Sequence, residues 1–367
     1  MTTATKERAA TITLSRTSLS EALADVLRAV PQRGPKPILA NVRLGDGLLT
    51  GTDLEIRIDR EMDYHGDALL LPGHRLSAIL RAATGDSVTL TPKGTSVTVK
   101  CGGGSWTLPT EDVAEYPTWD ASDMKAICRL PADQFGRAAR ATVYATDTES
   151  SRFALGGVLI DVTDGNPTWV ATDGRRLSCV ETETDQAVDD SQTIVPARVI
   201  AAVASMANGE GSVQIEANAQ EVRFTIDGCI VTGRLVDGRF PKWRDVVGEG
   251  EGEPAVIATG ELLQAVSAAA IVTSEQSKGI TLTWGKDSLT LMGRSSEYGE
   301  SRCTCPTIEH GTPATTKLDP KYLAQFLSHL PADEEPQVDV YVKDAQSRVL
   351  MKCGPYTGVI MPLAKDA

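Results

Sequence analysis

The sequence predicts an α+β protein of three similar domains, each built from two βαβββ halves, and two recurring patterns carry this prediction. A Thr-Asp pair at residues 52–53 returns 120 residues later, at residues 172–173, each time after an apolar stretch. Segments with apolar residues at helical spacing are led by Pro72, Pro196 and Pro320. Alternating strands follow them at residues 87–91, 212–216 and 337–341. Self-similarity at a fixed spacing is the signature of a repeated unit.

The first half of each unit also reads as a strand, a helix and further strands. We expect these helices at residues 19–30, after Thr17-Ser18, and at residues 133–145 and 261–272. Residues 289–296 are a third, looser copy of the Thr-Asp segment. Chance similarity between β-rich segments is the alternative, and three proline-led helices at matching places oppose it. The expected domains are residues 1–123, 124–252 and 253–367, the second boundary lying in the Gly- and Glu-rich run 248–254.

Composition and charge limit the functional classes. With 41% apolar and 23% charged residues, the chain is typical of a soluble globular protein with sizeable cores. No apolar run is long enough to span a membrane, and the polar N-terminus predicts no signal peptide. We therefore expect a cytoplasmic protein without membrane partners. A net charge of −13 does not favour tight, sequence-specific DNA binding, unless basic residues gather on one surface.

The seven cysteines and four histidines are scattered, without a Cys-x-x-Cys pair. We expect reduced thiols, no metal site and no cofactor. Motifs of the Gly-x-Ser-x-Gly, Walker and His-Glu-x-x-His types do not occur, and the glycines of residues 102–105 are expected to form a turn between strands. The acidic residues Asp161 and Asp164, and the run 181–185, are interpreted as solvated faces. A hydrolase or lyase using Asp53 or Asp173 as an acid stays an alternative, although an Asp-Gly turn explains Asp173 more simply.

A family resemblance runs along the whole chain. Its carriers are Pro37-Ile-Leu-Ala-Asn41, Thr52-Asp-Leu-Glu-Ile56, Thr107-Leu-Pro109, Ala171-Thr-Asp-Gly-Arg-Arg-Leu177, Gly238-Arg-Phe-Pro-Lys-Trp243 and Val359-Ile-Met-Pro-Leu363. In this order they resemble the bacterial DNA polymerase III beta subunit, the sliding clamp. The resemblance implies a non-catalytic processivity factor with three clamp-type domains per chain. Two chains would close head-to-tail into a ring around duplex DNA, with helices lining the hole and sheets outside.

The resemblance also implies a binding surface for double-stranded DNA without sequence recognition. The six expected helices that would line the hole sum to a charge of +3, which leaves −16 for the rest of the chain. A weakly positive lining attracts phosphates without holding the ring in place. The candidate DNA-binding residues are Arg28, Arg33, Lys36, Arg75, Arg81, Arg137, Arg140, Arg152 and Arg198.

A second implied site is an apolar groove for a short hydrophobic motif of partner proteins. The implied partners are the replicative DNA polymerase, the clamp loader complex and other clamp-motif proteins. Arg175 stands where the family commonly has His, and the polar tail 364–367 extends the chain beyond the groove residues. The groove residues are Leu155, Thr172, Gly174, Arg175, Leu177, Pro241, Val246, Tyr322, Ile360, Met361, Pro362 and Leu363.

The homodimer interface would join the first domain of one chain to the third domain of the other. Apolar contact would dominate it, with Trp106 and Leu108 facing Ile271 and Val272. Glu297 and Glu300 would lie near His74 and Arg75.

Besides the clamp and the hydrolase or lyase, a third functional alternative is a clamp-like interaction protein that keeps the groove but does not close on DNA.

Overall fold

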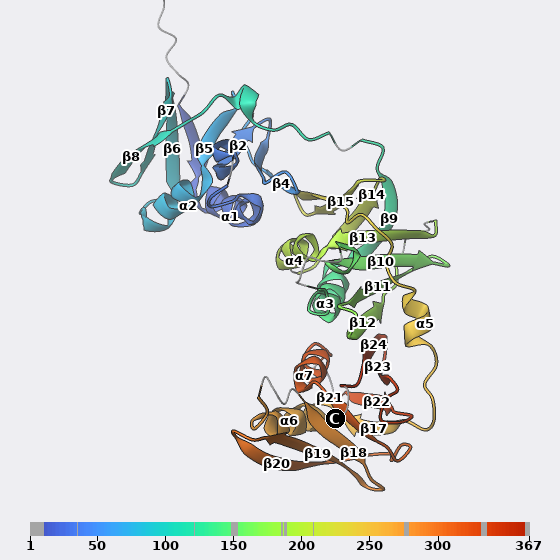
Figure 1. The fold of residues 1–367 in the computed structure, drawn as a ribbon. Coiled ribbons are helices and arrows are strands. Elements are labelled where there is room, and N and C mark those ends of the chain that lie inside the picture. Colours follow the sequence, from blue (N-terminus) through green and yellow to red (C-terminus); the bar gives the residue numbers. More distant parts are fainter. Residues whose placement is uncertain are drawn as a thin grey trace, which may run out of the picture. The chain divides into compact units, whose positions relative to one another are not determined.

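The computed structural model describes residues 11–34, 36–120, 122–147, 153–184, 186, 189–207, 209–274, 279–331 and 336–363. Its elements follow one another in a strand-helix-strand-strand-strand order six times along the chain (Figure 1). This order confirms the predicted α+β repeat of βαβββ halves. The chain forms two compact units, one of Met1–Ala126 with Ser205–Arg234 and one of Ile127–Ala204 with Leu235–Ala367.

The first unit contains two antiparallel sheets and two packed helices. One sheet has the order β1-β6-β7-β8, and the other runs β5-β2-β3-β4-β16-β15-β14 within this unit. Helices α1 and α2 contact each other and the second sheet. The elements are β1 (Ile12–Ser15), α1 (Arg16–Val26), η1 (Leu27–Ala29), η2 (Pro37–Ala40), β2 (Asn41–Gly45), β3 (Leu48–Thr52), β4 (Ile56–Glu61), β5 (Leu69–Pro72), α2 (Gly73–Ala82), β6 (Ser87–Lys93), β7 (Ser96–Cys101), β8 (Gly104–Pro109), η3 (Val113–Glu115), β14 (Ser212–Ala217), β15 (Glu221–Ile226) and β16 (Cys229–Arg234).

The second unit likewise contains two antiparallel sheets, one of them of eight strands, and among the described residues it has more helices than the first unit. Its strands follow the orders β13-β10-β11-β12-β24-β23-β22-β17 and β20-β19-β18-β21. The elements are α3 (Ala132–Val143), η4 (Phe153–Leu155), β10 (Gly157–Thr163), β11 (Asn166–Thr172), β12 (Arg176–Glu181), β13 (Ser191–Pro196), α5 (Trp243–Val247), β17 (Ala255–Ala258), α6 (Thr259–Ala270), β18 (Ile280–Trp284), β19 (Ser288–Ser295), β20 (Gly299–Pro306), β21 (Thr315–Leu318), α7 (Pro320–Ser328), β22 (Gln337–Tyr341), β23 (Val349–Cys353) and β24 (Tyr356–Ile360). Two elements, β9 (Lys125–Pro131) and α4 (Ala197–Met206), extend past the unit boundaries.

The start of the first helix differs from the sequence prediction. The predicted start at residue 19, after Thr17-Ser18, is wrong, because β1 ends at Ser15 and α1 begins directly at Arg16. The Ser15 hydroxyl accepts a hydrogen bond from the Ser18 backbone N–H at 3.4 Å, which caps the helix one turn earlier than expected. The buried residues Leu19 and Leu23 then face the sheet.

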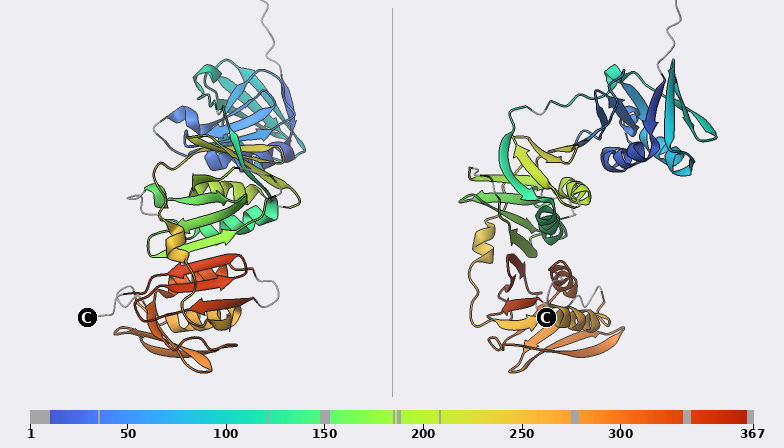
Figure 2. Two further views of the ribbon diagram at one scale, coloured as in Figure 1. Left: turned by 90° about the vertical axis from the view of Figure 1, so that its right-hand side faces the viewer. Right: turned by 180° about the vertical axis from the view of Figure 1, so that it is seen from behind.

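The helices of the second unit pack against its sheets (Figure 2), and the residues that they bury are mainly apolar. Phe135 of α3 meets the fully buried Trp169 of β11 edge-to-face, with ring centroids 5.3 Å apart. The indole N–H of Trp169 donates to the hydroxyl of Thr182 at 3.1 Å, so its polar atom is satisfied inside the core. Among the described residues, no helix is long and apolar enough to cross a bilayer.

Strands β12 and β24 join two repeats into one sheet. They pair antiparallel from Arg176 with Ile360 to Val180 with Tyr356, although they lie far apart in the sequence. Beneath them is a buried apolar cluster to which β10, β11, β13, β23 and α5 also contribute: Leu159, Val170, Leu177, Cys179, Ile194, Trp243, Leu350 and Val359. This pairing places the turn before β12 beside the end of β24.

Candidate partner-binding surface

The turn between β11 and β12 is held by its own side chains. The Thr172 hydroxyl donates to the Arg176 carbonyl at 2.5 Å and accepts from the Gly174 N–H at 3.1 Å. One oxygen of Asp173 accepts from the N–H groups of Arg175 and Arg176, at 2.9 and 3.0 Å. Gly174 has φ +86°, a conformation that favours glycine. The turn is therefore rigid at the point where it meets the candidate groove.

The first copy of the Thr-Asp pair forms the same turn between β3 and β4. Thr52 donates to the Ile56 carbonyl at 2.8 Å and accepts from the Leu54 N–H at 3.0 Å. Asp53 accepts from the N–H groups of Glu55 and Ile56, each at 3.0 Å. The repeated pair is thus a turn signature, in which the carboxylate binds backbone N–H groups. This explains both Asp side chains without a catalytic role.

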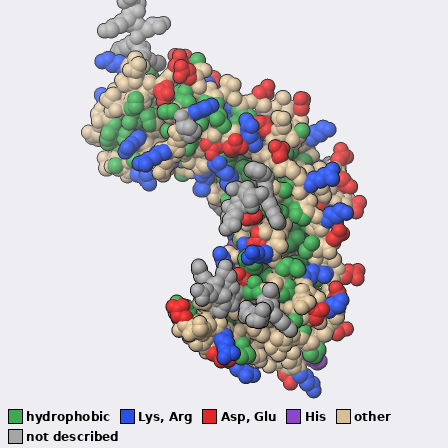
Figure 3. Space-filling view, in the orientation of Figure 1, with side chains coloured by type: hydrophobic (Ala, Val, Ile, Leu, Met, Phe, Trp, Pro, Cys, Tyr) green, Lys and Arg blue, Asp and Glu red, His purple; other side chains and the backbone are tan. Residues whose placement is uncertain are grey.

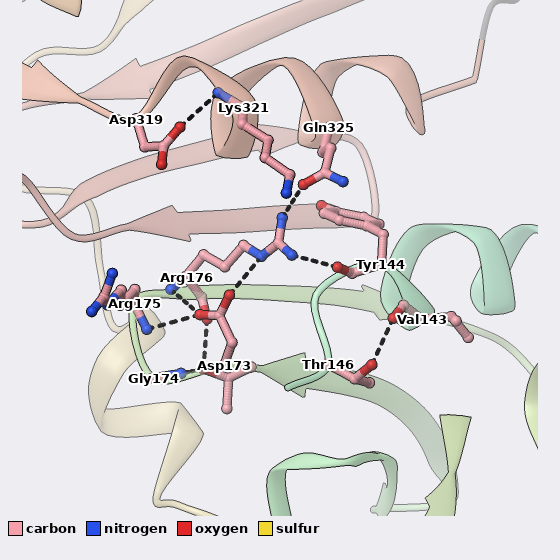
Figure 4. Close-up of polar contacts among 11 residues, drawn as sticks. Val143, Tyr144, Thr146, Asp173, Gly174, Arg175, Arg176, Asp319, Lys321 and Gln325 are labelled. Atoms are coloured by element: carbon pink, nitrogen blue, oxygen red, sulfur yellow. Dashed lines mark hydrogen bonds and ion pairs between the residues drawn. The ribbon is translucent and has the colours of Figure 1, made fainter. Parts of the chain in front are cut away.

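Arg176, the first residue of β12, connects this turn to two helices (Figure 4). Its Nε atom lies 3.0 Å from an oxygen of Asp173, and one terminal nitrogen donates to the Tyr144 carbonyl, just beyond α3, at 2.5 Å. The other donates to the side-chain oxygen of Gln325 on α7. The guanidinium also lies 4.5 Å from the ring centroid of Tyr322. Because its side chain is only 10% exposed, this is a largely buried junction.

The chain beyond β24 continues in an extended form along the same surface. The N–H of Met361 donates to the Arg175 carbonyl at 2.8 Å, and the N–H of Leu363 donates to the Lys317 carbonyl at 2.8 Å. Met361 is 44% exposed, so its apolar side chain is accessible from solvent. The last described residues therefore run from the β12 turn to β21.

Helix α5 forms another side of this surface and is attached through Asp161 of β10. The Trp243 indole donates to Asp161 Oδ2 at 2.7 Å, and Arg244 forms an ion pair with the same oxygen. Asp161 is 1% exposed, so the prediction of a solvated face is wrong for this residue, although Asp164 is exposed. The sequence signal that could have indicated this burial is an acid inside the apolar run 157–162. All residues of that run are buried in the structure.

The predicted groove residues all lie in the second unit, around β12, β24, α5 and α7. Four of them, Leu155, Thr172, Leu177 and Ile360, are buried and support the surface from beneath. The others reach solvent wholly or in part: Gly174, Arg175, Pro241, Val246, Tyr322, Met361, Pro362 and Leu363. We refer to these eight residues as the partner surface. Hydrophobic side chains are visible over this part of the unit in Figure 3.

The candidate DNA-binding residues lie mainly on helices and are exposed. In the first unit, Arg28 is on η1, Arg33 and Lys36 are on the following loop, and Arg75 and Arg81 are on α2. Figure 3 shows Lys and Arg side chains gathered over this region. Elsewhere, Arg137 and Arg140 are on α3 and Arg198 is on α4. Arg137 is paired with Asp133 at 2.7 Å, and Arg152 lies outside the described residues.

The candidate dimer residues of the first unit lie on β8 and α2. Trp106 is half-buried, and its ring covers Gly104, where an added Cβ would come within 2.1 Å of it. Leu108 is 9% exposed, so it belongs largely to the unit's own core. His74 is half-buried with its Nε2 atom 3.0 Å from the Val30 carbonyl oxygen, whereas Arg75 is exposed.

The candidate dimer residues of the second unit lie just after α6 and around the β19–β20 turn. Ile271 is 77% exposed, the highest value among the large apolar side chains that the structure describes as exposed. Val272 is partly buried, and Glu297 and Glu300 are exposed.

Burial disfavours ionisation of thiol and phenol groups in the core. Burial raises the pKa of the Cys128 and Cys179 thiols to about 12, and that of the Tyr144 hydroxyl to about 12. All seven cysteines are free, and all except Cys303 are buried. Within the described ranges, no group of His, Cys, Asp or Glu side chains could hold a metal ion.

Six βαβββ halves, with two sheets in each compact unit, define a clamp-type protein. Two family models match the chain: the N-terminal domain of the DNA polymerase III beta subunit at residues 10–120, and its central domain at residues 129–242. The chain belongs to the DNA polymerase III beta subunit family. This is the family of the beta sliding clamp, a non-catalytic processivity factor, which sets aside the hydrolase or lyase alternative.

Individual relatives agree over nearly the whole chain. A beta sliding clamp of Pseudomonas putida is 28% identical over 352 residues, covering 93% of this chain and 95% of that protein. The crystal structure of a DNA polymerase sliding clamp from Pseudomonas aeruginosa with ligand has a TM-score of 0.88 at 26% identity, covering 96% and 99% of the two chains. A sliding clamp from Bacillus subtilis has the same fold, with a TM-score of 0.90 at 21% identity and coverage of 98% and 100%.

Proposed function

We propose that the chain closes as a head-to-tail homodimer around duplex DNA in the cytoplasm and tethers the replicative polymerase to it. The observation that supports this proposal is the βαβββ order, which occurs six times along the chain, together with membership of the beta subunit family. The proposed domains are residues 1–123, 124–252 and 253–367. Each would contribute two helices to the hole.

Exposed cations on the helices support contact with DNA phosphates. Arg75, Arg81 and Arg140 are all exposed on helix surfaces, in a chain whose net charge is −13. Few cations within an acidic protein give an attraction that salt screens readily, and such an attraction permits sliding. No base readout is required of a ring, so the proposed binding is independent of sequence.

Two sheet edges support the dimer. Strand β8 is an outer strand of its sheet in the first unit, and β20 is an outer strand of its sheet in the second. An edge strand leaves backbone groups available for pairing with another chain. Trp106 on β8 and Ile271 after α6 would add the apolar contact that the interface needs. Because the two edges differ, the contact is head-to-tail, and two such contacts close a ring.

The partner surface supports docking of short hydrophobic peptides. Met361 and Val246 are exposed at 44% and 37%, and flexible or branched apolar groups accept varied ligands. The proposed ligands are motifs of the polymerase, the clamp loader complex and other clamp-binding proteins. Arg175 makes the rim of this surface basic.

Single-particle imaging of the purified protein tests the ring. We expect closed rings of two chains with a hole wide enough for duplex DNA. Loader-assisted retention on circular plasmid, lost when the plasmid is linearised, would show that the ring encircles DNA. Monomers or open dimers at micromolar concentration would contradict the ring and favour the clamp-like protein that does not encircle DNA.

Fluorescence anisotropy of a short labelled peptide with Leu and Phe side chains tests the partner surface. We expect binding by the wild type and at least about tenfold weaker binding by Met361→Ala, because a partly exposed anchor is lost. Ile308→Ala is the matched control, since Ile308 is 55% exposed outside this surface. Equal loss in both variants, or binding unchanged by Met361→Ala, would contradict the assignment.

A further inference from the structure

Helix α5 is too short to hold its own shape. It has five residues, Trp243–Val247, and lies in the long connection between β16 and β17. Isolated helices of this length are not stable in water, so tertiary contacts must fix it. Its Trp243 is 8% exposed and belongs to the apolar cluster beneath β12 and β24. Val247 at the other end of α5, and Phe240 before the helix, are partly buried and pack against the same cluster, so apolar contacts attach both ends of α5 to the sheet.

Polar contacts add to this packing: Arg348 donates to the Val247 carbonyl at 3.0 Å at the end of the helix, and the Asp161 carboxylate holds its start. Trp243 donates to Asp161 Oδ2 at 2.7 Å, and Arg244 pairs with the same oxygen. Arg244 also donates to the Thr163 hydroxyl at 2.9 Å and lies 4.4 Å from the Trp243 ring centroid. Two consecutive residues of α5 are thus fixed by one strand, β10.

The Asp161 contacts are specific because the carboxylate is buried. A buried charge is costly unless donors surround it, and here an indole N–H and a guanidinium supply them. Asp161 is 1% exposed, while the Arg244 side chain is 48% exposed and closes the site toward solvent. Losing the negative charge would leave both donors with a weaker acceptor.

Two residues of the partner surface, Pro241 and Val246, lie close in the chain to Trp243 and Arg244, which contact Asp161. The Trp243 N–H donates to the Pro241 carbonyl at 2.7 Å, which fixes Pro241 before the helix. Val246 follows two residues after Arg244, and the Gly248 N–H donates to the Arg244 carbonyl at 3.0 Å, which ends the helix. Both residues therefore lie within two positions of a residue that Asp161 holds, while the end of α5 is also held by Arg348.

We propose that Asp161 is a positioning residue of the partner surface: through Trp243 and Arg244 it sets the place of Pro241 and Val246, and thereby the affinity for partner peptides. The proposal rests on the proposed peptide-binding function. It assigns Asp161 no contact with the peptide. It extends the binding determinants to a buried carboxylate of β10.

The test is the affinity of the labelled Leu- and Phe-containing peptide for Asp161→Asn. We expect binding about tenfold weaker than wild type, because the neutral amide holds α5 less firmly. Backbone amide hydrogen exchange should become faster in residues 241–248, while the rest of the protein exchanges as in the wild type. The matched control is Asp164→Asn, which changes an exposed acid in the turn directly after the same strand, where φ is +52° and Asn is well accepted.

A second comparison separates positioning from general loss of stability. If Asp161 acts by placing Val246, the Asp161→Asn effect on affinity should shrink to about twofold or less in a Val246→Ala background. If Asp161→Asn fails to fold, Arg244→Gln replaces it: the carboxylate and its indole bond are kept, and we expect about threefold weaker binding. Wild-type affinity in the variant that folds, or an undiminished effect in the Val246→Ala background, would overturn the proposal. Failure of the wild type itself to bind the peptide would instead contradict the proposed function.

Discussion

Arg176 shows how much of the partner surface depends on one side chain. A guanidinium offers five N–H donors in a fixed plane, and those of Arg176 reach Asp173, Gln325 and the Tyr144 carbonyl. Lysine could not make these contacts together, because an ammonium group is compact and not planar. The residue therefore connects the β12 turn, the end of α3 and α7.

Replacing Arg176 by Ala should destabilise the second unit. Asp173 Oδ2 and the Tyr144 carbonyl would lose the donor that Arg176 supplies, and the Asp173 side chain is only 15% exposed, so we expect about 2–3 kcal/mol lower free energy of unfolding. Urea denaturation measures this loss. The control Arg175→Ala removes an exposed neighbour and should change stability by less than about 0.5 kcal/mol. Equal effects of the two changes would show that Arg176 is not the junction.

The buried thiol of Cys179 predicts a loss of stability in alkali. Burial raises the pKa of this thiol to about 12, from an ordinary value of 9.0 in the unfolded chain. Above pH 9 the unfolded state therefore binds fewer protons than the native state, so stability falls as the pH rises toward 12. Between pH 9 and 11, the free energy of unfolding of Cys179→Ala should fall less steeply than that of wild type, by about 1 kcal/mol per pH unit. Parallel curves would contradict the assignment.

At the scale of elements, α7 is positioned by a glycine in β24. The Phe326 ring lies against Gly358, where an added Cβ would come within 2.6 Å of its ring atoms. Gly358 is paired with Ser178 of β12, so the strand cannot move aside without disturbing that pairing. The close approach of α7 to β24 therefore needs glycine at this position.

Gly358→Ala should displace α7 and weaken the partner surface that Tyr322 helps to form. We expect a stability loss of about 1–3 kcal/mol from overpacking, measured by urea denaturation, together with weaker peptide binding. Gly354→Asn is the control, since Gly354 is in an open turn with φ +54°, which Asn accepts. A variant at Gly358 with wild-type stability and affinity would show that the contact is easily relieved.

At the scale of the whole molecule, a substitution at Ile271 tests the dimer without destabilising the fold of the single chain. Because this side chain is 77% exposed, Ile271→Asp should leave the stability of the single chain within about 0.5 kcal/mol. Within an apolar interface, the same change buries an unpaired carboxylate and should convert dimers to monomers. Mass photometry at nanomolar concentration measures the two species.

The matched control for the dimer is Ile308→Asp, which places the same charge at a position 55% exposed outside the proposed interface. It should stay dimeric. Monomers in both variants would point to a general effect of charge, and dimers in both would remove Ile271 from the interface.

The sequence by itself determined the repeat, the helices and the turns. Helical spacing, proline at helix starts and the Thr-Asp pair are local signals, because the chemistry that they encode acts within a few residues. The six helices of the repeat were therefore predicted within about four residues of their positions, and the turn at Asp173-Gly174 was predicted. The structure added that Thr52-Asp53 forms the same turn and that Trp243–Val247 is a helix. Membership of the clamp family followed from motifs in a fixed order.

Only the tertiary structure decided which distant strands pair and which polar groups become buried. Nothing local in residues 176–180 selects residues 356–360 as their neighbours, since strand partners are chosen by packing of the whole sheet. The same packing buries Asp161 against α5 and places Arg176 between two helices, although both residues resemble surface charges in the sequence. Local patterns define elements and turns, whereas the burial of a charge depends on partners that lie 82 and 149 residues away, at Trp243 and Gln325.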